Sequence, residues 1–167
     1  MIEVEVTDYM RVKARSMARE LGKLKNSITK GDGNIAGFIG ELIALNHLGG
    51  VQANTYDFDI VSDGKTYDVK TKRCTSPPKP NYDCSVAAFN TKQRCDIYFF
   101  VRVQFQGDRP VRAWMLGQKD KAEYFKQARK LKRGDIDPSN NFKVKADCFN
   151  LSINLLDKLM KVKKIKC

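Results

Sequence analysis

The hydrophobic and polar positions of the chain follow two periods, and their order predicts a mixed α/β fold. Apolar residues that alternate with polar ones are typical of strands. They occur in 2–6, 56–61, 66–72, 84–89, 111–116 and 142–146. Residues 97–105 are almost continuously apolar, which predicts a central strand covered on both faces. Apolar residues three or four positions apart predict helices. These cover 8–24, 34–48, 119–133 and 152–164.

The two ends of the chain carry further expectations. Thr7 or Asp8 can cap the first helix, whose apolar stripe is Val12, Met17, Leu21 and Leu24. Near the other end, alternation through Phe149, Leu151 and Ile153 leaves the start of the last helix open. The basic segment 161–167 is expected to be a frayed tail. With these elements in this order, we expect an α/β fold with a mixed central β-sheet flanked by helices.

The segment 56–72 has the strongest local signal, that of a β-hairpin. Asp63-Gly64 lies between the two alternating runs, and both residues can take the positive φ angles of a two-residue turn. This turn pairs Ile60 with Tyr67 and Asp59 with Asp68. One face, the expected core side, then carries Phe58, Ile60, Tyr67 and Val69. The other face carries Asp57, Asp59, Asp68 and Lys70.

The predicted register sets two carboxylates opposite each other. Cβ atoms of directly opposed residues lie roughly 5 Å apart, and like charges at that spacing destabilise a sheet. A cation between Asp59 and Asp68 would remove the repulsion. Two facing acids with Lys70 nearby are also the groups needed for metal-assisted hydrolysis of a phosphodiester. Asp57 becomes the rival ligand if the register slips.

Composition favours a nucleic-acid partner. The 167 residues suit one domain, 1–167, and 31 Lys+Arg against 19 Asp+Glu give a formal charge of +12. A charge of this size suggests a polyanionic partner. We expect no membrane span and no signal peptide, because no apolar run has the required length. Five irregularly spaced cysteines fit free thiols in a reducing, cytoplasmic compartment better than disulfides, and a zinc site at Cys74, Cys84 and Cys95 lacks a CxxC pair.

The helix over 34–48 should be largely buried, because its apolar residues cover a wide arc. Gly37 and Gly40 are poor helix residues, and close packing or access for a ligand would explain them. Glu41 is an acid on a buried helix and therefore needs a partner.

Glu41, Asp59 and Asp68-Val69-Lys70 together resemble the motif of the PD-(D/E)xK nuclease superfamily, which has the restriction-endonuclease-like fold. That family shows an acid on a helix, an acid on one strand and an acid-x-Lys on the next. The resemblance covers residues 34–72. Two positions depart from the family pattern: Phe58 stands where a proline precedes the first aspartate, and Asp68 is the less usual choice of second acid.

The resemblance implies a function for each matched residue. Asp59 and Asp68 would bind Mg²⁺ or Mn²⁺, with the Val69 carbonyl and Glu41 completing the ligand shell. Lys70 would orient the attacking water or offset charge on the phosphate. Phosphate contacts are expected from Lys72, Arg73, Lys92, Gln93 and Arg94. The family also implies DNA as substrate, a small phage-type or resolvase-like enzyme in a prokaryotic or phage-infected cell, and a homodimer.

Three alternatives stay open from the sequence. Asp59 and Asp68 can be ordinary surface residues with Lys70 paired to Asp57, a pair worth about 0–1 kcal/mol. The chain can be a non-catalytic nucleic-acid-binding module on the same fold, although an acidic cluster would repel phosphate. It can also be a basic protein–protein adaptor or inhibitor, which predicts no metal dependence.

Overall fold

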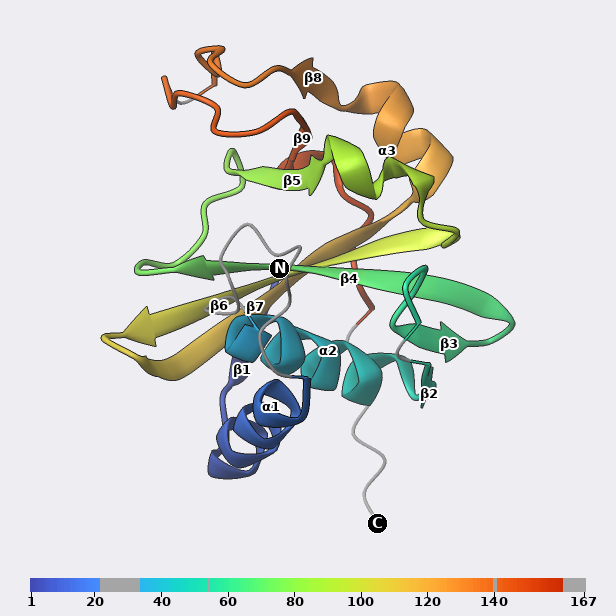
Figure 1. Ribbon diagram of the computed structural model, residues 1–167, viewed down its shortest axis with the longest axis vertical. Coiled ribbons are helices and arrows are strands. Elements are labelled where there is room, and N and C mark those ends of the chain that lie inside the picture. The colour runs from blue at the N-terminus through green and yellow to red at the C-terminus, as the bar shows by residue number, and fades with distance from the viewer. Residues whose placement is uncertain (22–33, 54, 140, 161–167) are drawn as a thin grey trace.

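The computed structural model describes residues 1–21, 34–53, 55–139 and 141–160, and its elements form three layers (Figure 1). The helices are α1 (Asp8–Leu21), α2 (Asn34–Leu48) and α3 (Lys121–Gln127), with 3₁₀ turns η1 (Ala88–Lys92) and η2 (Ile153–Leu155). The larger sheet contains β1 (Ile2–Glu5), β2 (Val51–Gln52), β3 (Ile60–Ser62), β4 (Lys65–Cys74), β6 (Ile97–Gln106) and β7 (Arg109–Asp120). The smaller sheet contains β5 (Asp83–Ala87), β8 (Arg129–Leu131) and β9 (Cys148–Ser152). The mixed α/β character predicted from the sequence is confirmed.

The larger sheet is mixed because of one parallel pair. Its six strands run in the order β1-β7-β6-β4-β3-β2, and only β4 and β6 are parallel neighbours. The chain between these two strands, residues 75–96, crosses over the sheet and contributes β5. β6 is the predicted central strand, and its residues 97–103 are buried throughout, as expected for a strand covered on both faces.

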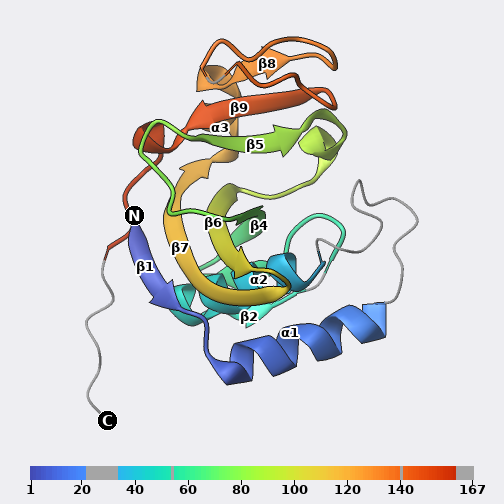
Figure 2. The same ribbon diagram turned by 90° about the vertical axis from the view of Figure 1, so that its left-hand side faces the viewer.

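Each face of the larger sheet packs on its own hydrophobic core. α2 covers one face, where Ile39 and Ile43 contact the sheet side of the first core, and α1 packs against α2. The small sheet and α3 cover the opposite face, where Tyr98, Phe100 and Tyr124 form the centre of the second core. Figure 2 shows this order from the side, with the small sheet above, the larger sheet between and α1 below.

The turn of the hairpin has the predicted register. Asp63 and Gly64 have φ angles of 48° and 73°, and Ile60 pairs with Tyr67. One side-chain assignment is wrong, because Phe58 packs in the second core while Ile60, Tyr67 and Val69 pack in the first. The reason is that β3 begins only at Ile60. Alternation therefore does not extend back to Phe58.

Four other predicted elements need correction. The helix over 8–24 is α1 in its described part, but Val12 is exposed and Ala14 is buried. The helix over 119–133 ends at Gln127, because residues 129–131 pair with β9 as β8. Residues 142–146 hold only an isolated bridge between Ile136 and Lys143. The predicted helix 152–164 is, as far as residue 160, a strand end and a 3₁₀ turn, while residues 22–24 and the tail 161–167 lie outside the described residues.

Candidate active site

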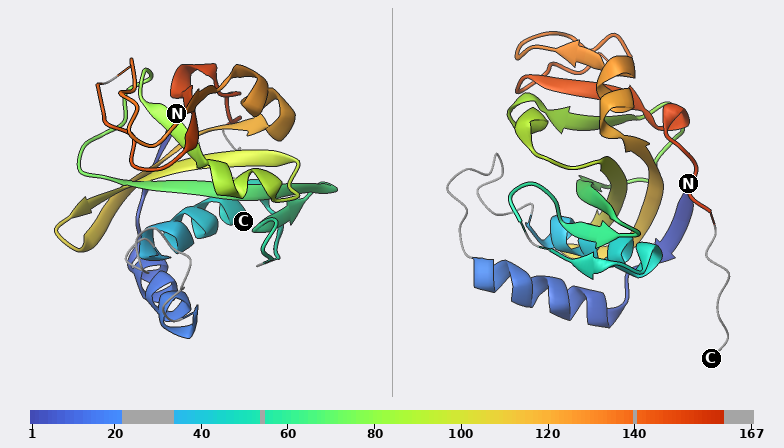
Figure 3. Two further views of the ribbon diagram at one scale, coloured as in Figure 1. Left: turned by 45° about the horizontal axis from the view of Figure 1, so that its top comes forward. Right: turned by 90° about the vertical axis from the view of Figure 1, so that its right-hand side faces the viewer.

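The site lies where the pairing between β3 and β4 ends. β4 pairs with β6 along residues 67–74, whereas β3 pairs with it only over Lys65–Tyr67. Beyond Tyr67 no described strand extends this edge of β4, and α2 packs against the face of the sheet that adjoins it (Figure 3). A strand edge with free main-chain groups is therefore available next to a buried helix.

Asp59 occupies that edge. Its backbone N–H donates to the Tyr67 carbonyl at 2.9 Å, and its carboxylate Oδ2 accepts from the Val69 N–H at 2.7 Å. The side chain thus replaces the next main-chain pairing of the hairpin. The preceding loop is fixed by Thr55, whose hydroxyl donates to the Phe58 carbonyl and accepts from the Phe58 N–H. Because N–H and C=O of one strand residue point to the same edge, the Val69 carbonyl also faces this side.

Asp68 is a buried acid with an incompletely satisfied carboxylate. It is 4% exposed, and Lys70 Nζ lies 2.6 Å from its Oδ2. The geometry of this ion pair is not that of a hydrogen bond, and Oδ2 accepts none from the described residues. The Lys70 ammonium therefore balances the charge of Asp68, although this oxygen accepts no hydrogen bond of standard geometry from the described residues.

Glu41 joins the two aspartates from α2. Burial raises the pKa of Glu41 to about 8, and the charges of Asp59 and Asp68 add to this, while a hydrogen bond from Gln52 opposes it. Burial and the Asp68 charge likewise raise the pKa of Asp59 to about 6, against the opposing effects of the Val69 N–H and Lys70. The three predicted acids are therefore close enough to repel one another in a partly buried place.

Gly40 explains how α2 comes so near to β4. A Cβ built on Gly40 would lie 1.9 Å from the Thr71 hydroxyl oxygen, so only glycine fits between helix and strand. Gly37 has no such neighbour within 4 Å. Of the two explanations for these glycines, close packing holds for Gly40, and it brings the next residue, Glu41, towards the strand.

Lys70 is held by Gln93, a residue that the sequence analysis expects to contact phosphate and not to position the lysine. Its ammonium donates to Gln93 Oε1 at 3.0 Å, and Gln93 Nε2 donates to the Tyr56 carbonyl at 2.8 Å. Lys121 Nζ donates to the Gln93 carbonyl, and the Lys70 ammonium lies 5.7 Å from the centre of the Tyr98 ring. These contacts join parts of the chain that are far apart in sequence, so no local pattern indicates them.

The rival assignments of Asp57 are not supported. Its Oδ1 accepts from the Arg94 backbone N–H at 3.0 Å, which ties the loop before β3 to the loop before β6. Lys70 pairs with Asp68 rather than with Asp57. The turn has the predicted register as far as Ile60 and Tyr67, and the Asp59 carboxylate then bonds to the N–H of Val69, the residue after Asp68.

The five predicted phosphate contacts do not form one surface. Lys72 lies two residues beyond Lys70 on the same face of β4, whereas Arg73 is on the opposite face, 4.2 Å from the Phe105 ring centre. Lys92 and Arg94 are exposed on either side of Gln93, whose side chain is already bonded to Lys70. Of the five, Gln93 contacts the candidate site through Lys70, and Lys72 lines a pocket together with Lys70.

Among the described residues, no group of three or more His, Cys, Asp or Glu side chains is arranged so that it could hold a metal ion. This applies to the three acids and equally to Cys74, Cys84 and Cys95. Carboxylate and carbonyl oxygens are nevertheless the ligands that Mg²⁺ and Mn²⁺ prefer. Burial and mutual repulsion raise the pKa values of Glu41 and Asp59, and Lys70 is the cation that lies against Asp68.

Comparison with known proteins does not add a family to this description. The sequence matches no protein-family model, and it matches no curated protein at a significant level. Within the described ranges, no helix has both the length and the apolar character that crossing a membrane requires.

Proposed function

We propose that the protein is a divalent-metal-dependent endonuclease that hydrolyses phosphodiester bonds in DNA, with a PD-(D/E)xK active site on a restriction-endonuclease-like fold. The observation that carries the proposal is the buried group of Asp59, Asp68 and Glu41 beside Lys70. The acids come from a helix, the start of one strand and the next strand, in the order of the family motif. A surface role does not explain why like charges are placed together under partial burial.

The acids would hold the metal ion. Asp68 lies on β4, Asp59 directly precedes β3, the Val69 carbonyl faces the same edge, and Glu41 approaches from α2. A bound Mg²⁺ or Mn²⁺ would polarise a phosphate oxygen and lower the pKa of a coordinated water. Binding also removes the repulsion among the carboxylates, because the ion favours their charged forms.

Lys70 would orient the attacking water and offset charge that develops on the phosphate. It is suited to this because Gln93 and Asp68 fix its ammonium, so little reorganisation is needed when substrate binds. A positioned donor of this kind acts in a partly buried place, where electrostatic interactions are stronger than in water.

The second candidate is a non-catalytic nucleic-acid-binding module. Its support is the net charge of +12 and the exposed Lys92 and Arg94 near the site. The acidic group argues against it, because carboxylates repel phosphate unless a cation is present. We expect a homodimer, as for other small nucleases of this superfamily, so that two sites can address two strands.

Plasmid cleavage by an Asp68→Asn variant tests the proposal. Supercoiled DNA is incubated with Mg²⁺ and with EDTA, and DNA binding is measured by gel shift in EDTA. We expect the variant to lose at least about 100-fold in cleavage rate and to keep DNA binding. Asp63→Asn is the matched control, because it removes the same charge from the same hairpin at a turn position that suits asparagine.

The outcomes separate the candidate functions. Cleavage by wild type that needs Mg²⁺ and is lost only in Asp68→Asn supports the nuclease. DNA binding without cleavage under any metal condition supports the binding module. A protein that neither binds nor cleaves DNA would support the third class, an adaptor or inhibitor. A parallel assay with RNA of the same sequence shows which nucleic acid is cut.

A further inference from the structure

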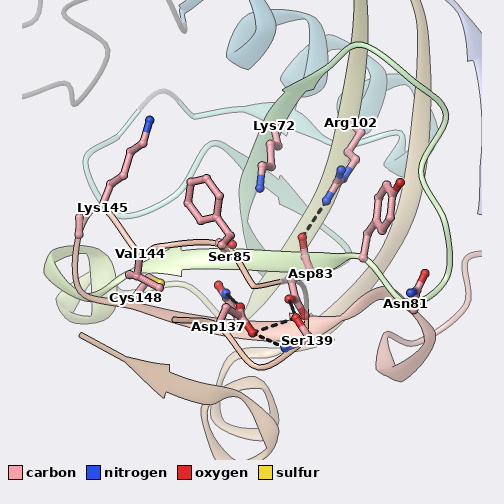
Figure 4. A pocket seen from close by; sticks show the side chains of 14 residues that line it. Lys72, Asn81, Asp83, Ser85, Arg102, Asp137, Ser139, Val144, Lys145 and Cys148 are labelled. Carbon is pink, nitrogen blue, oxygen red and sulfur yellow. Dashed lines mark hydrogen bonds between the residues drawn. The ribbon is translucent and has the colours of Figure 1, made fainter. Parts of the chain in front are cut away.

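A pocket of about 510 Å³ lies between the small sheet and the β4–β6 face of the larger sheet (Figure 4). We call it the inter-sheet pocket. Its lining includes Lys72, Arg102 and Lys145 as cations and Tyr82 and Phe142 as aromatic residues. Pockets of 300–1,000 Å³ with apolar walls and a few charged groups are typical of sites for small molecules or parts of larger ligands.

The inter-sheet pocket continues towards the candidate active site. An adjoining pocket of about 380 Å³ is lined by Lys70 and shares Lys72, Asp83 and Arg102 with it. Lys70 and Lys72 are two residues apart on one face of β4, roughly 6.6 Å along the strand. This distance is on the scale of one nucleotide step along an extended nucleic-acid strand.

Two cations stand side by side in this pocket. Lys72 on β4 and Arg102 on β6 are register partners in the parallel pair, and both line the pocket. Arg102 is only 7% exposed and donates to the Asp83 backbone carbonyl at 2.9 Å, which carries no charge. Crowding by protein atoms and the Arg102 charge lower the pKa of Lys72. Like charges that face each other destabilise a sheet, and an anion between them would remove the repulsion.

The acids near the pocket are partly balanced, because Asp83 and Asp137 share the one positive charge of Arg129 and keep a single negative charge between them. Asp83 and Asp137 both pair with Arg129, at 3.0 and 3.4 Å, and both accept from the Ser139 hydroxyl. Asn150 donates a further hydrogen bond to Asp137 at 2.8 Å. The positive charge of the three lining cations is therefore in excess inside the pocket.

An aromatic residue stands next to the anion site. The Arg102 guanidinium lies 5.2 Å from the centre of the Tyr82 ring, and both residues line the pocket. Proteins bind unpaired bases by stacking them on aromatic rings or on arginine planes. Such a pair beside a place for phosphate matches the two parts of a nucleotide.

We propose that the inter-sheet pocket binds one unpaired nucleotide of the substrate strand, with its phosphate between Lys72 and Arg102 and its base against Tyr82. The proposal rests on the proposed function, because it places this nucleotide next to the bond that is cut. A pocket of this volume between two sheets admits one nucleotide and excludes a duplex. The preferred substrate would then be DNA with a single-stranded or unstacked region beside the cleavage point.

DNA binding without metal tests the inference. A short labelled single strand and a blunt duplex of the same sequence are titrated in EDTA with wild type, Lys72→Met and Arg102→Met. We expect each variant to lose about tenfold in affinity for the single strand and little for the duplex, and the salt dependence of single-strand binding to become less steep. Lys13→Met on α1 is the control, because it removes one exposed charge from the other side of the larger sheet.

Two further measurements keep the test decisive. Arg102 is buried, so its variant is first compared with wild type in thermal unfolding, whereas Lys72 is exposed and its variant is expected to fold normally. Unchanged single-strand affinity of Lys72→Met overturns the inference. Equal losses for single strand and duplex also overturn it. Free thymidine monophosphate is also tested as a competitor. If it displaces the labelled strand at a concentration similar to the dissociation constant of the strand, the pocket is a mononucleotide site and the assignment to a substrate strand is overturned.

Failure of the inference is distinct from failure of the proposed nuclease. If Asp68→Asn abolishes cleavage but Lys72→Met binds single strands as wild type does, the nuclease stands and only the assignment of the pocket is overturned. If the wild type does not cleave DNA but binds single strands in a way that depends on Lys72 and Arg102, the proposal of nuclease activity is overturned. The inter-sheet pocket is then a single-strand-binding site.

Discussion

At the scale of residues, the site depends on charges that are placed where their own ionisation is unfavourable. Glu41 has a pKa raised to about 8 and Asp59 to about 6, in both cases mainly by burial. Surrounding groups offset only part of this effect. Such acids are costly for stability, and proteins keep them mostly where a ligand or a reaction needs them.

The first prediction concerns the pH dependence of stability. Unfolded Glu41 loses its proton near pH 4.5, whereas folded Glu41 keeps it to about pH 8. Between these values the folded state binds the extra proton, so the free energy of unfolding falls as pH rises. Asp59 contributes in the same direction between about pH 3.8 and 6. We expect Glu41→Gln to flatten this decline in thermal melts from pH 5 to 8. Glu20→Gln on α1 should leave the decline as in wild type.

The same pKa values predict how metal acts on stability. Bound Mg²⁺ requires charged carboxylates, so its affinity should rise with pH up to about 8. Added Mg²⁺ is therefore expected to raise the melting temperature more at pH 8 than at pH 6, with no such difference in Asp68→Asn. A shift that is equal at both pH values, or equal in the variant, would contradict a metal site at these acids.

Gln93 is predicted to be a positioning residue for Lys70. Gln93→Leu removes the acceptor that holds the Lys70 ammonium, and we expect kcat for DNA cleavage to fall about tenfold with KM little changed. Gln93→Glu keeps an acceptor oxygen and should restore much of the rate. Gln127→Leu on α3 is the control. A change confined to KM would indicate that Gln93 contacts DNA instead.

At the scale of elements, α2 and β4 are fitted to each other at one point. Gly40 lies against Thr71, and this contact sets the distance between Glu41 and the hairpin. α2 otherwise packs through ordinary apolar residues such as Ile39 and Ile43. The position of one catalytic candidate therefore depends on a glycine that takes no part in the chemistry.

Gly40→Ala is expected to destabilise the protein by about 1–3 kcal/mol, because its Cβ would overlap the Thr71 hydroxyl. Gly37→Ala is the matched control on the same helix. It meets nothing within 4 Å and should stabilise by up to about 1 kcal/mol. Chemical denaturation measures both. Equal effects of the two substitutions would show that the helix does not approach β4 as closely as described.

Sequence reasoning succeeded where the determining contacts are local. The Asp63-Gly64 turn fixes the hairpin register within a few residues, and the bounds of α2 match the predicted 34–48. It failed where pairing with a strand that is distant in sequence determines the secondary structure. Residues 129–131 have a helical pattern but pair with β9, and residues 148–152 pair with both β5 and β8. Tertiary pairing of this kind overrides local propensity.

The candidate site divides in the same way. The four residues Glu41, Asp59, Asp68 and Lys70 follow from one helix and one hairpin, so their types and spacing could be read from the sequence. Gln93 beside Lys70, and Arg102 beside Lys72, come from the crossover and from β6. Their positions depend on the parallel pairing of strands, which no local pattern determines.

At the scale of the whole molecule, a polar network holds the small sheet together. Asp83 lies on β5 and is 5% exposed, and Asp137 lies between β8 and β9 and is 1% exposed. Both pair with Arg129 on β8. Two buried carboxylates that share one guanidinium depend strongly on it, since an uncompensated buried charge is costly.

Arg129→Met is therefore expected to lower the free energy of unfolding by about 2–4 kcal/mol and to increase hydrogen exchange of β5 and β9 amides. The exchange of α2 amides should change less, because α2 packs on the opposite face of the larger sheet. Arg133→Met, an exposed neighbour, serves as control. An unchanged melting temperature would show that the network contributes no net stability.

The single parallel pairing in the larger sheet has a consequence for synthesis. A nascent chain that has emerged only to residue 96 contains every acid of the candidate site, together with Lys70 and Gln93, but β4 then has only the short β3 as a partner. An isolated two-stranded hairpin is marginally stable in water. The charged residues gain their fixed positions once β6 has been made and has paired with β4, so the candidate site forms late in synthesis.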